Sequence, residues 1–148
     1  MAHAVACLGA GFALAACGGS SYTEDLSNAQ AIIASAKAKT PVPPGARYNA
    51  QWFAIQPGMQ YQTGYFLTVA EQESLCMWYL YWLQGYSSGN ANQMHAAQRA
   101  FTAMQTWPLF TGDPNTGSQL DSIQQKAALG DPADMRQFVS QNCGGISP

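Results

Sequence analysis

The sequence predicts a mainly α-helical protein, a small bundle of four to five helices packed around a central aromatic-rich helix at about residues 69–84. Apolar residues recur at three- and four-residue spacing in several separate segments, as they do along one face of a helix. Helix-capping residues precede these segments, and Gly or Pro follows them. The most apolar stretch is residues 75–83, in which nine apolar residues follow one another. We expect the rest of the chain to fold around that stretch.

The central helix has sequence signals at both of its ends. Thr68 and Glu71 have the spacing of a capping box, which favours a start at Val69. Glu71 and Glu73 then place negative charge near the positive end of the helix dipole, and Gly85 suits a left-handed C-terminal residue. Apolar residues extend around most of the circumference, so other segments should cover this helix on several sides. A buried strand is the alternative, because Trp and Tyr also favour strands.

Before the central helix, the pattern predicts one amphipathic helix and one irregular segment. The helix covers roughly residues 22–39, since Ser21 and Glu24 have capping-box spacing and a Pro-rich connector stops the run. Residues 46–67 mix aromatic residues with Gln and Gly. We expect them to be irregular and to cover the central helix, with a short helix near residues 50–55 and one alternating stretch that suits a short strand.

After the central helix, three more helices are expected, each with a capping signal. The first starts at Asn90 and ends at Trp107, which precedes a proline. Ser118 caps the second, which stops at a glycine. The third starts at Asp131, which a proline follows at the first helical position. These segments together make a single helical domain of residues 22–148.

The charge of the chain excludes one class of function. Only 9% of the residues are charged, and the net charge is −2. The six Lys and Arg residues are scattered singly rather than gathered into a stripe that could follow a phosphate backbone. We therefore expect no nucleic-acid partner.

The N-terminal residues have the pattern of an export signal. Residues 4–16 form an uncharged apolar run of the length found in signal peptides, which is short for a transmembrane helix. The run ends in Leu14-Ala15-Ala16-Cys17, which resembles the lipobox of bacterial lipoproteins. The three residues before the run contain no Lys or Arg, where such signals carry positive charge, and a start site further upstream would account for this. A buried N-terminal helix is the alternative, which the glycines of the segment disfavour.

This resemblance implies how the protein is processed and where it is held. Residues 1–16 would be removed as a signal peptide, Cys17 would receive the lipid, and residues 17–21 would link the lipid to the domain. Two or three acyl chains hold a protein on a membrane almost permanently. The expected location is the outer face of the bacterial cell membrane, or the periplasm or outer membrane in a cell with two membranes. The membrane is therefore an expected partner, through the lipid on Cys17.

Cys76 and Cys143 are the two cysteines of the domain itself. In an exported chain the simplest interpretation is a disulfide between them. It would tie the C-terminal end of the chain to the middle of the central helix, which the loop-closure treatment values at about 4 kcal/mol. Two separate buried thiols are the alternative.

The sequence contains no recognisable catalytic motif. His95 is the only histidine after the apolar run, and Arg99 follows it by one helical turn, but neither has the partners of a catalytic triad or a zinc site. Glu71 and Glu73 are two residues apart, on different faces of a helix, and do not make an acid–base pair. We therefore expect no catalysis, no cofactor and no metal. A secreted enzyme, or an accessory to one, with a site near His95 and Arg99 is the alternative.

Aromatic residues beside many amides are the one feature that suggests binding. Tyr and Trp flanked by Gln and Asn can stack on sugars, bond to them, or anchor a partner chain. We expect contact with a glycan or an envelope protein from some of four residues, Tyr48, Trp52, Tyr61 and Tyr65. The same residues would also serve as core. The expected function is a non-catalytic binding or structural role, and an inhibitor or protective lipoprotein acting through residues 48–66 is a further alternative.

Overall fold

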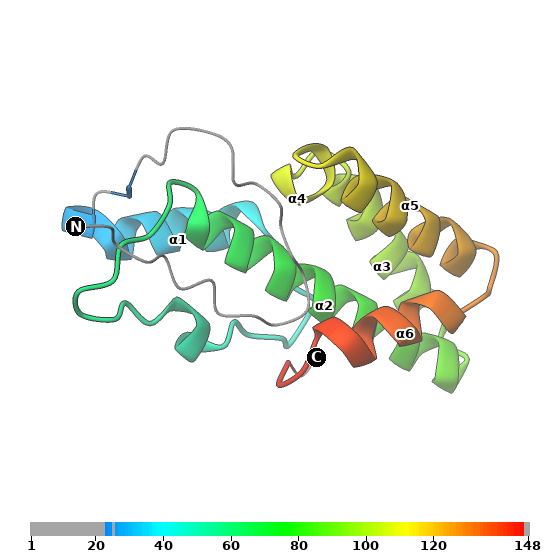
Figure 1. The fold of residues 1–148 in the computed structure, drawn as a ribbon. Helices are drawn as coiled ribbons and strands as arrows, with labels where there is room; N and C mark the ends of the chain where they lie inside the picture. The colour runs from blue at the N-terminus through cyan, green and yellow to red at the C-terminus, as the bar shows by residue number, and fades with distance from the viewer. Residues whose placement is uncertain (1–22, 25, 147–148) are drawn as a thin grey trace.

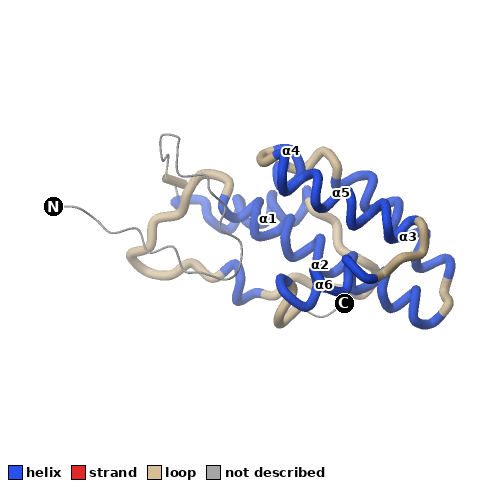
Figure 2. The backbone as a smooth tube through the Cα atoms, turned by 45° about the vertical axis from the view of Figure 1, so that its right-hand side comes forward, coloured by secondary structure: helices blue, strands red, loops and turns tan. Residues whose placement is uncertain are grey.

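The computed structural model describes residues 23–24 and 26–146 and confirms a mainly helical fold (Figure 1). One long helix, α2, runs through the middle, and the other helices pack around it (Figures 1 and 2). Within those residues the chain forms no strand, and a bridge pairs Thr23 with Gln62. The α-helices and the two 3-10 helices, η1 and η2, are in chain order η1 Leu26–Asn28, α1 Ala29–Lys39, η2 Ala50–Phe53, α2 Tyr65–Ser88, α3 Ala91–Met104, α4 Pro108–Thr111, α5 Pro114–Ala128 and α6 Ala133–Asn142.

α2 is covered on several sides, as the sequence predicts. Every residue from 73 to 79 is buried, and this run makes about two helical turns. Tyr79 lies at the centre of the larger apolar cluster, with its ring 5.3 Å from that of Phe101 in α3 and 5.4 Å from that of Phe138 in α6. A smaller cluster joins the first part of α2 to α1 and η2. Both apolar clusters therefore include residues of α2.

Both predicted ends of the central helix are wrong, because α2 starts at Tyr65 and ends at Ser88 instead of covering about 69–84. Gly64 precedes the helix in a left-handed conformation (φ 86°), and Thr68 lies inside it. The predicted capping box does not form, since the carboxylate of Glu71 accepts a hydrogen bond from a distant backbone group. At the other end the glycine in the left-handed conformation is Gly89 (φ 70°).

Gly85 lies inside α2 and serves packing instead of ending the helix. A Cβ at this position would lie 3.0 Å from Cβ of Gln93 and 3.2 Å from Cγ of Met94. The side chain of Gln93 also donates a hydrogen bond to the carbonyl of Tyr81 in α2 (2.8 Å). The missing side chain of Gly85 therefore lets α3 lie close against α2.

The first helix is shorter at its start than predicted. α1 begins at Ala29, after the turn of η1, and ends at Lys39. Glu24 does not cap it, because its carboxylate accepts from the backbone N–H of Gly64 (2.9 Å). Its own backbone N–H donates to the carbonyl of Tyr61 (2.7 Å). The chain before α1 is thus bonded to the segment before α2.

The connector between α1 and η2 is fixed to α2 by hydrogen bonds. The carbonyl of Pro41 accepts from Ser74 Oγ (2.7 Å) and from Trp78 Nε1 (2.8 Å). The backbone N–H of Asn49 donates to the carboxylate of Glu73. These hydrogen bonds hold the connector, which is neither helix nor strand, against α2.

The segment predicted to be irregular, residues 46–67, is irregular up to residue 64, and its last three residues belong to α2. Its 3-10 helix, η2, lies where a short helix is predicted. The alternating stretch makes the bridge at Gln62 rather than a strand. Phe53 and Tyr61 are buried in the smaller cluster, so aromatic side chains of this segment do cover the start of α2.

In the C-terminal half, α3 and α6 form close to where the sequence predicts them, and α5 begins earlier. Asn90 caps α3 by accepting from the backbone N–H of Gln93 (3.1 Å). Asp113 caps α5 by accepting from the backbone N–H of Thr116 (2.9 Å), so Ser118, the predicted cap, lies inside the helix. The single-turn helix α4 between them was not expected.

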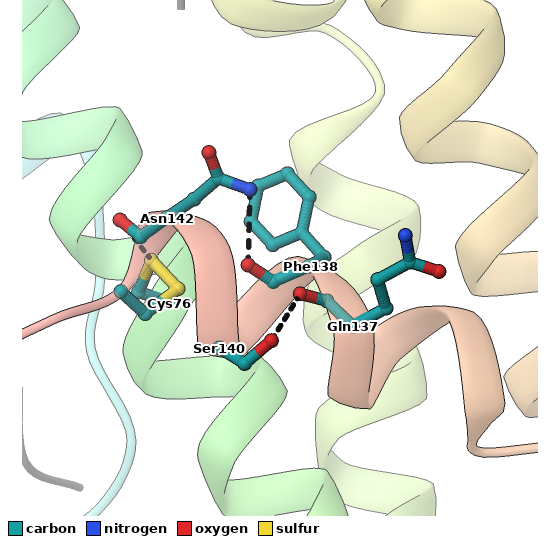
Figure 3. Close-up of a disulfide and its surroundings, with 6 residues drawn as sticks. Cys76, Gln137, Phe138, Ser140 and Asn142 are labelled. Atoms are coloured by element: carbon teal, nitrogen blue, oxygen red, sulfur yellow. Dashed lines mark hydrogen bonds between the residues drawn. A yellow bond between two sulfur atoms is a disulfide. The ribbon is translucent and has the colours of Figure 1, made fainter. Parts of the chain in front are cut away.

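Cys76 and Cys143 form a disulfide, which confirms the predicted pairing (Figure 3). Their Cα atoms lie 5.6 Å apart, and the bond closes a loop between residues separated by 67 positions. It ties the residue after α6 to the middle of α2. The side-chain amide of Asn142 donates to the carbonyl of Phe138 (2.9 Å) beside the bond and secures the last turn of α6.

The predicted signal peptide, the linker and Cys17 lie outside the described residues. None of the helices in the described part of the chain is both long enough and apolar enough to cross a membrane.

Candidate functional site

A groove lies between α5 and α6, with a volume of about 860 Å³. The two helices are joined by a short turn at residues 129–132 and pack against each other. Figure 1 shows them on the half of the molecule away from the start of α1. The groove is lined by residues of both helices, namely Asn115, Ser118, Gln119, Ser122, Ile123, Asp134, Gln137, Phe138, Gln141 and Asn142.

Most of the lining side chains are neutral hydrogen-bonding groups. Seven of the ten residues carry an amide or a hydroxyl. Three of the amides, on Gln119, Gln137 and Gln141, have no hydrogen-bond partner within the described residues, and all three residues are exposed. Figure 3 shows the side chain of Gln137 extending away from the disulfide with no bond drawn to its amide. These amides can therefore donate and accept toward a bound molecule.

The floor of the groove is part of the packed core. Ile123 and Phe138 are 4% and 6% exposed, and both belong to the larger apolar cluster. The disulfide at Cys143 holds the end of α6 against α2. The polar side chains of the groove thus lie on helices whose positions are fixed by close packing and by the disulfide.

One ion pair joins α5 to α6 near the turn between them. Lys126 Nζ of α5 lies 2.6 Å from Asp134 Oδ2 of α6. This bond raises the pKa of Lys126, the pair being exposed to solvent. Asp134 is the one charged residue of the lining, and it is paired, so the groove as a whole is close to neutral.

This chemistry limits what the groove can bind. Sites for drug-like molecules are lined mainly by apolar side chains with a few polar groups, whereas seven of the ten residues that line this groove carry an amide or a hydroxyl. Its neutrality gives no attraction for a phosphate or another highly charged ligand. The arrangement suits a neutral ligand that is rich in hydroxyl and amide groups.

The amide residues that line this groove follow a pattern that is visible in the sequence. Asn115 and Gln119 are four residues apart on α5, and Gln137 and Gln141 are four residues apart on α6. Residues at that spacing lie on the same face of a helix. Two uncharged amide rows on neighbouring helices could therefore have been found, but their meeting depends on how α5 and α6 pack.

The four aromatic residues predicted to contact a ligand do not form one exposed surface. Tyr61 is 8% exposed, and its hydroxyl accepts from the backbone N–H of Gln56 (2.9 Å). Tyr48 is half-buried and bonds to Thr40 through its hydroxyl. Burial and the nearby Glu73 carboxylate raise the pKa of Tyr48, which the bond to Thr40 opposes in part.

Trp52 is half-buried beside the smaller apolar cluster, while Tyr65 is 40% exposed. Only Tyr65 of the four presents a large surface to solvent. A role for these residues in ligand contact stays a prediction.

His95 and Arg99, the pair on which an enzymatic site would depend, are both exposed on α3. The ring of His95 has Gln98 as its neighbour, with Nδ1 3.3 Å from Oε1. Among the described residues, no group of three or more His, Cys, Asp or Glu side chains is placed to hold a metal ion. The two residues lie on an open helix surface rather than in a pocket.

Glu71 and Glu73 are buried, each 1% exposed, and are not the helix-start charges that the sequence predicts. Glu71 Oε2 accepts from the backbone N–H of Leu109 at the start of α4 (2.9 Å). Burial raises the pKa of Glu71 to about 7, against the opposing effect of this bond. Burial also raises the pKa of Glu73, whose Oε2 has no hydrogen-bond partner in the described part of the chain. These carboxylates join α2 to its neighbours rather than open to a cavity.

Comparison with protein-family models, with curated proteins and with solved structures finds no match to this chain.

Proposed function

We propose that the protein is a lipid-anchored binding protein of the bacterial cell envelope that holds a neutral glycan in the groove between α5 and α6. The observation that carries the proposal is the lining of the groove, with seven amide or hydroxyl side chains of which several have no partner in the described chain. The anchor is the lipid expected on Cys17.

The anchor is supported by the sequence and by the chemistry of the cysteines. Leu14-Ala15-Ala16-Cys17 resembles a lipobox, and the segment before it has the length of a signal peptide. The disulfide between Cys76 and Cys143 suits an oxidising compartment outside the cytoplasm. Both features agree with export.

A neutral glycan suits the groove for three reasons. Sugar hydroxyls and N-acetyl groups donate and accept hydrogen bonds, as do the side chains of Gln119 and Gln137. Few charges meet the ligand, because Asp134 is already paired with Lys126. The volume of about 860 Å³ is within the range of about 300–1,000 Å³ that small-ligand sites occupy. The envelope outside a bacterial membrane also supplies such chains.

The proposal contains no catalytic step. A general acid or base needs a titratable group within hydrogen-bond reach of the ligand. Asp134 is the only such group in the lining, and its ion pair with Lys126 occupies one of its oxygens. The groove is therefore assigned to binding.

The test is titration with chito-oligosaccharides, which are neutral chains of N-acetylated sugars, followed by backbone amide NMR. We expect saturable shifts confined to α5 and α6. Gln119→Ala and Gln137→Ala should each weaken binding about 2- to 10-fold, since each removes hydrogen bonds worth about 0.5–1.5 kcal/mol. Gln30→Ala, an exposed amide on α1, is the matched control and should bind as the parent does.

Shifts that lie mainly outside α5 and α6, or equal affinity for all variants, would contradict the assignment. Saturable binding of an uncharged extended peptide at the same residues, with none of the sugar, would replace the glycan with an envelope protein as the ligand.

A further inference from the structure

The end of the molecule that the anchor joins carries exposed apolar side chains. Residues 54–60 are all exposed and include Ile55 (36%) and Met59 (46%). Tyr65, at the start of α2, is 40% exposed. We call Ile55, Met59 and Tyr65 the anchor-end patch. Figures 1 and 2 both show this segment beside the start of α1, where the described chain begins.

The segment that carries the patch is held by a buried tyrosine. The hydroxyl of Tyr61 accepts from the backbone N–H of Gln56 (2.9 Å), which closes the loop on itself. The ring of Tyr61 lies 5.0 Å from that of Tyr65. The side chain of Tyr61 thus connects the exposed loop to the start of α2.

The first described residues are bonded directly to this segment. Thr23 pairs with Gln62 in the bridge. The backbone of Glu24 donates to Tyr61 (2.7 Å), and its carboxylate accepts from Gly64 (2.9 Å). Thr23 and Glu24 are therefore bonded to the segment that lies between Met59 and Tyr65 of the patch.

The length of chain between the anchor and the bridge limits how far the patch can move from the membrane. Cys17 and Thr23 are six positions apart in the sequence. Six residues span at most about 20 Å when fully extended. A lipid on Cys17 would therefore keep Thr23, and with it the paired Gln62, within about that distance of the bilayer surface.

The composition of the segment suits the interfacial layer of a membrane. Residues 48–70 contain no Asp, Glu, Lys, Arg or His. Contact with lipid would therefore remove no charged group of this segment from water. Removing a charge from water is the most costly part of burying polar surface. The nearest carboxylate, that of Glu24, is already bonded to Gly64. Tyr is also one of the residues enriched at membrane–water interfaces.

We propose that the anchor-end patch rests in the interfacial layer of the membrane that holds the lipid on Cys17. The inference rests on the proposed anchor and adds a second, reversible contact to it. Three apolar side chains bind a bilayer weakly by themselves, but a short tether raises their local concentration to the millimolar range. The groove between α5 and α6 lies over the other half of the molecule, so this contact turns the groove away from the membrane (Figure 1).

The experiment uses the mature chain that the anchor implies, residues 17–148, coupled through the thiol of Cys17 to maleimide-bearing lipids in phosphatidylcholine vesicles. Backbone hydrogen exchange is compared between the coupled and the free chain. We expect several-fold slower exchange at residues 54–64 on vesicles, because lipid excludes water from the loop. The turn at residues 129–132, at the far end, should exchange equally in both.

A second measurement uses tryptophan as a reporter. Met59→Trp is compared with Leu129→Trp, whose parent residue is 87% exposed on the opposite half of the molecule. In vesicles of lipid brominated on the acyl chains, Met59→Trp should lose roughly half of its added emission, since an interfacial side chain lies about 5–10 Å into the boundary. Leu129→Trp should lose almost none.

Equal exchange on and off vesicles, together with equal quenching of both reporters, would overturn the contact. Because the coupling is chemical, this outcome is independent of whether a cell attaches lipid to Cys17. If the protein in cells carried no lipid on Cys17, the proposed anchor would be wrong. The contact measured on vesicles would not be affected by that finding.

Discussion

At the residue scale, Glu71 combines a charge with almost complete burial. Its side chain is 1% exposed and has one backbone hydrogen bond, to Leu109. Burial raises its pKa from 4.5 to about 7, so the native protein holds this proton more tightly than the unfolded chain does. Its contribution to the free energy of unfolding is therefore greatest at low pH and is lost as the pH rises from about 4.5 to about 7.

Glu71→Gln keeps an acceptor oxygen for Leu109 and removes the titration. We expect the variant to be more stable than the parent at about pH 8, by up to about 3 kcal/mol, and about equally stable at about pH 4.5. Urea unfolding followed by circular dichroism measures both free energies. The pKa of Glu73 is raised as well, so some pH dependence should persist in the variant. Parallel pH profiles for the two proteins would show that Glu71 does not titrate in this range.

At the element scale, the sequence predicts which helices form better than where they start. Asn90 is a correct cap because its partner, the backbone N–H of Gln93, lies three residues away. Thr68 and Glu71 have equally good spacing, but the carboxylate of Glu71 bonds to a residue 38 positions away. Capping rules consider only residues close in the sequence, so they cannot predict a competing partner as distant as Leu109. The same holds for Glu24, whose carboxylate bonds to Gly64 across 40 positions.

The start of α5 allows this distinction to be measured. Asp113 accepts from the backbone N–H groups of Asn115 and Thr116, and also from the Thr116 hydroxyl. Asp113→Ala should therefore cost about 1 kcal/mol of the free energy of unfolding. Ser118→Ala, at the cap that the sequence predicts, should change it by less than about 0.5 kcal/mol, because Ser118 is exposed inside the helix. Denaturant unfolding of the two variants side by side decides between the two starts, and a larger loss for Ser118→Ala would contradict the structure.

At the scale of the whole molecule, the disulfide is the longest-range feature that the sequence predicts correctly. It could be predicted because the domain has two cysteines and the chain resembles an exported one. The groove could not, since it depends on how α5 and α6 pack against each other. The attachment of the connector at Pro41 to α2 was likewise beyond prediction, because its bonds to Ser74 and Trp78 join distant segments.

Removing the disulfide should weaken the whole bundle. The loop that it closes joins residues 67 positions apart. We expect Cys76→Ala with Cys143→Ala to lose about 2–5 kcal/mol of the free energy of unfolding. A reducing agent should destabilise the parent by a similar amount and leave the double variant unchanged. If reduction affected both proteins equally, the effect would not come from this bond.

The account as a whole depends on export and anchoring, and the most direct measurement is the intact mass of the protein isolated from the membranes of its own cell. The account predicts a chain that starts at Cys17, carries added acyl mass on that residue, and is two hydrogens lighter than its reduced form. A chain that retains Met1 and carries no acyl mass would contradict it.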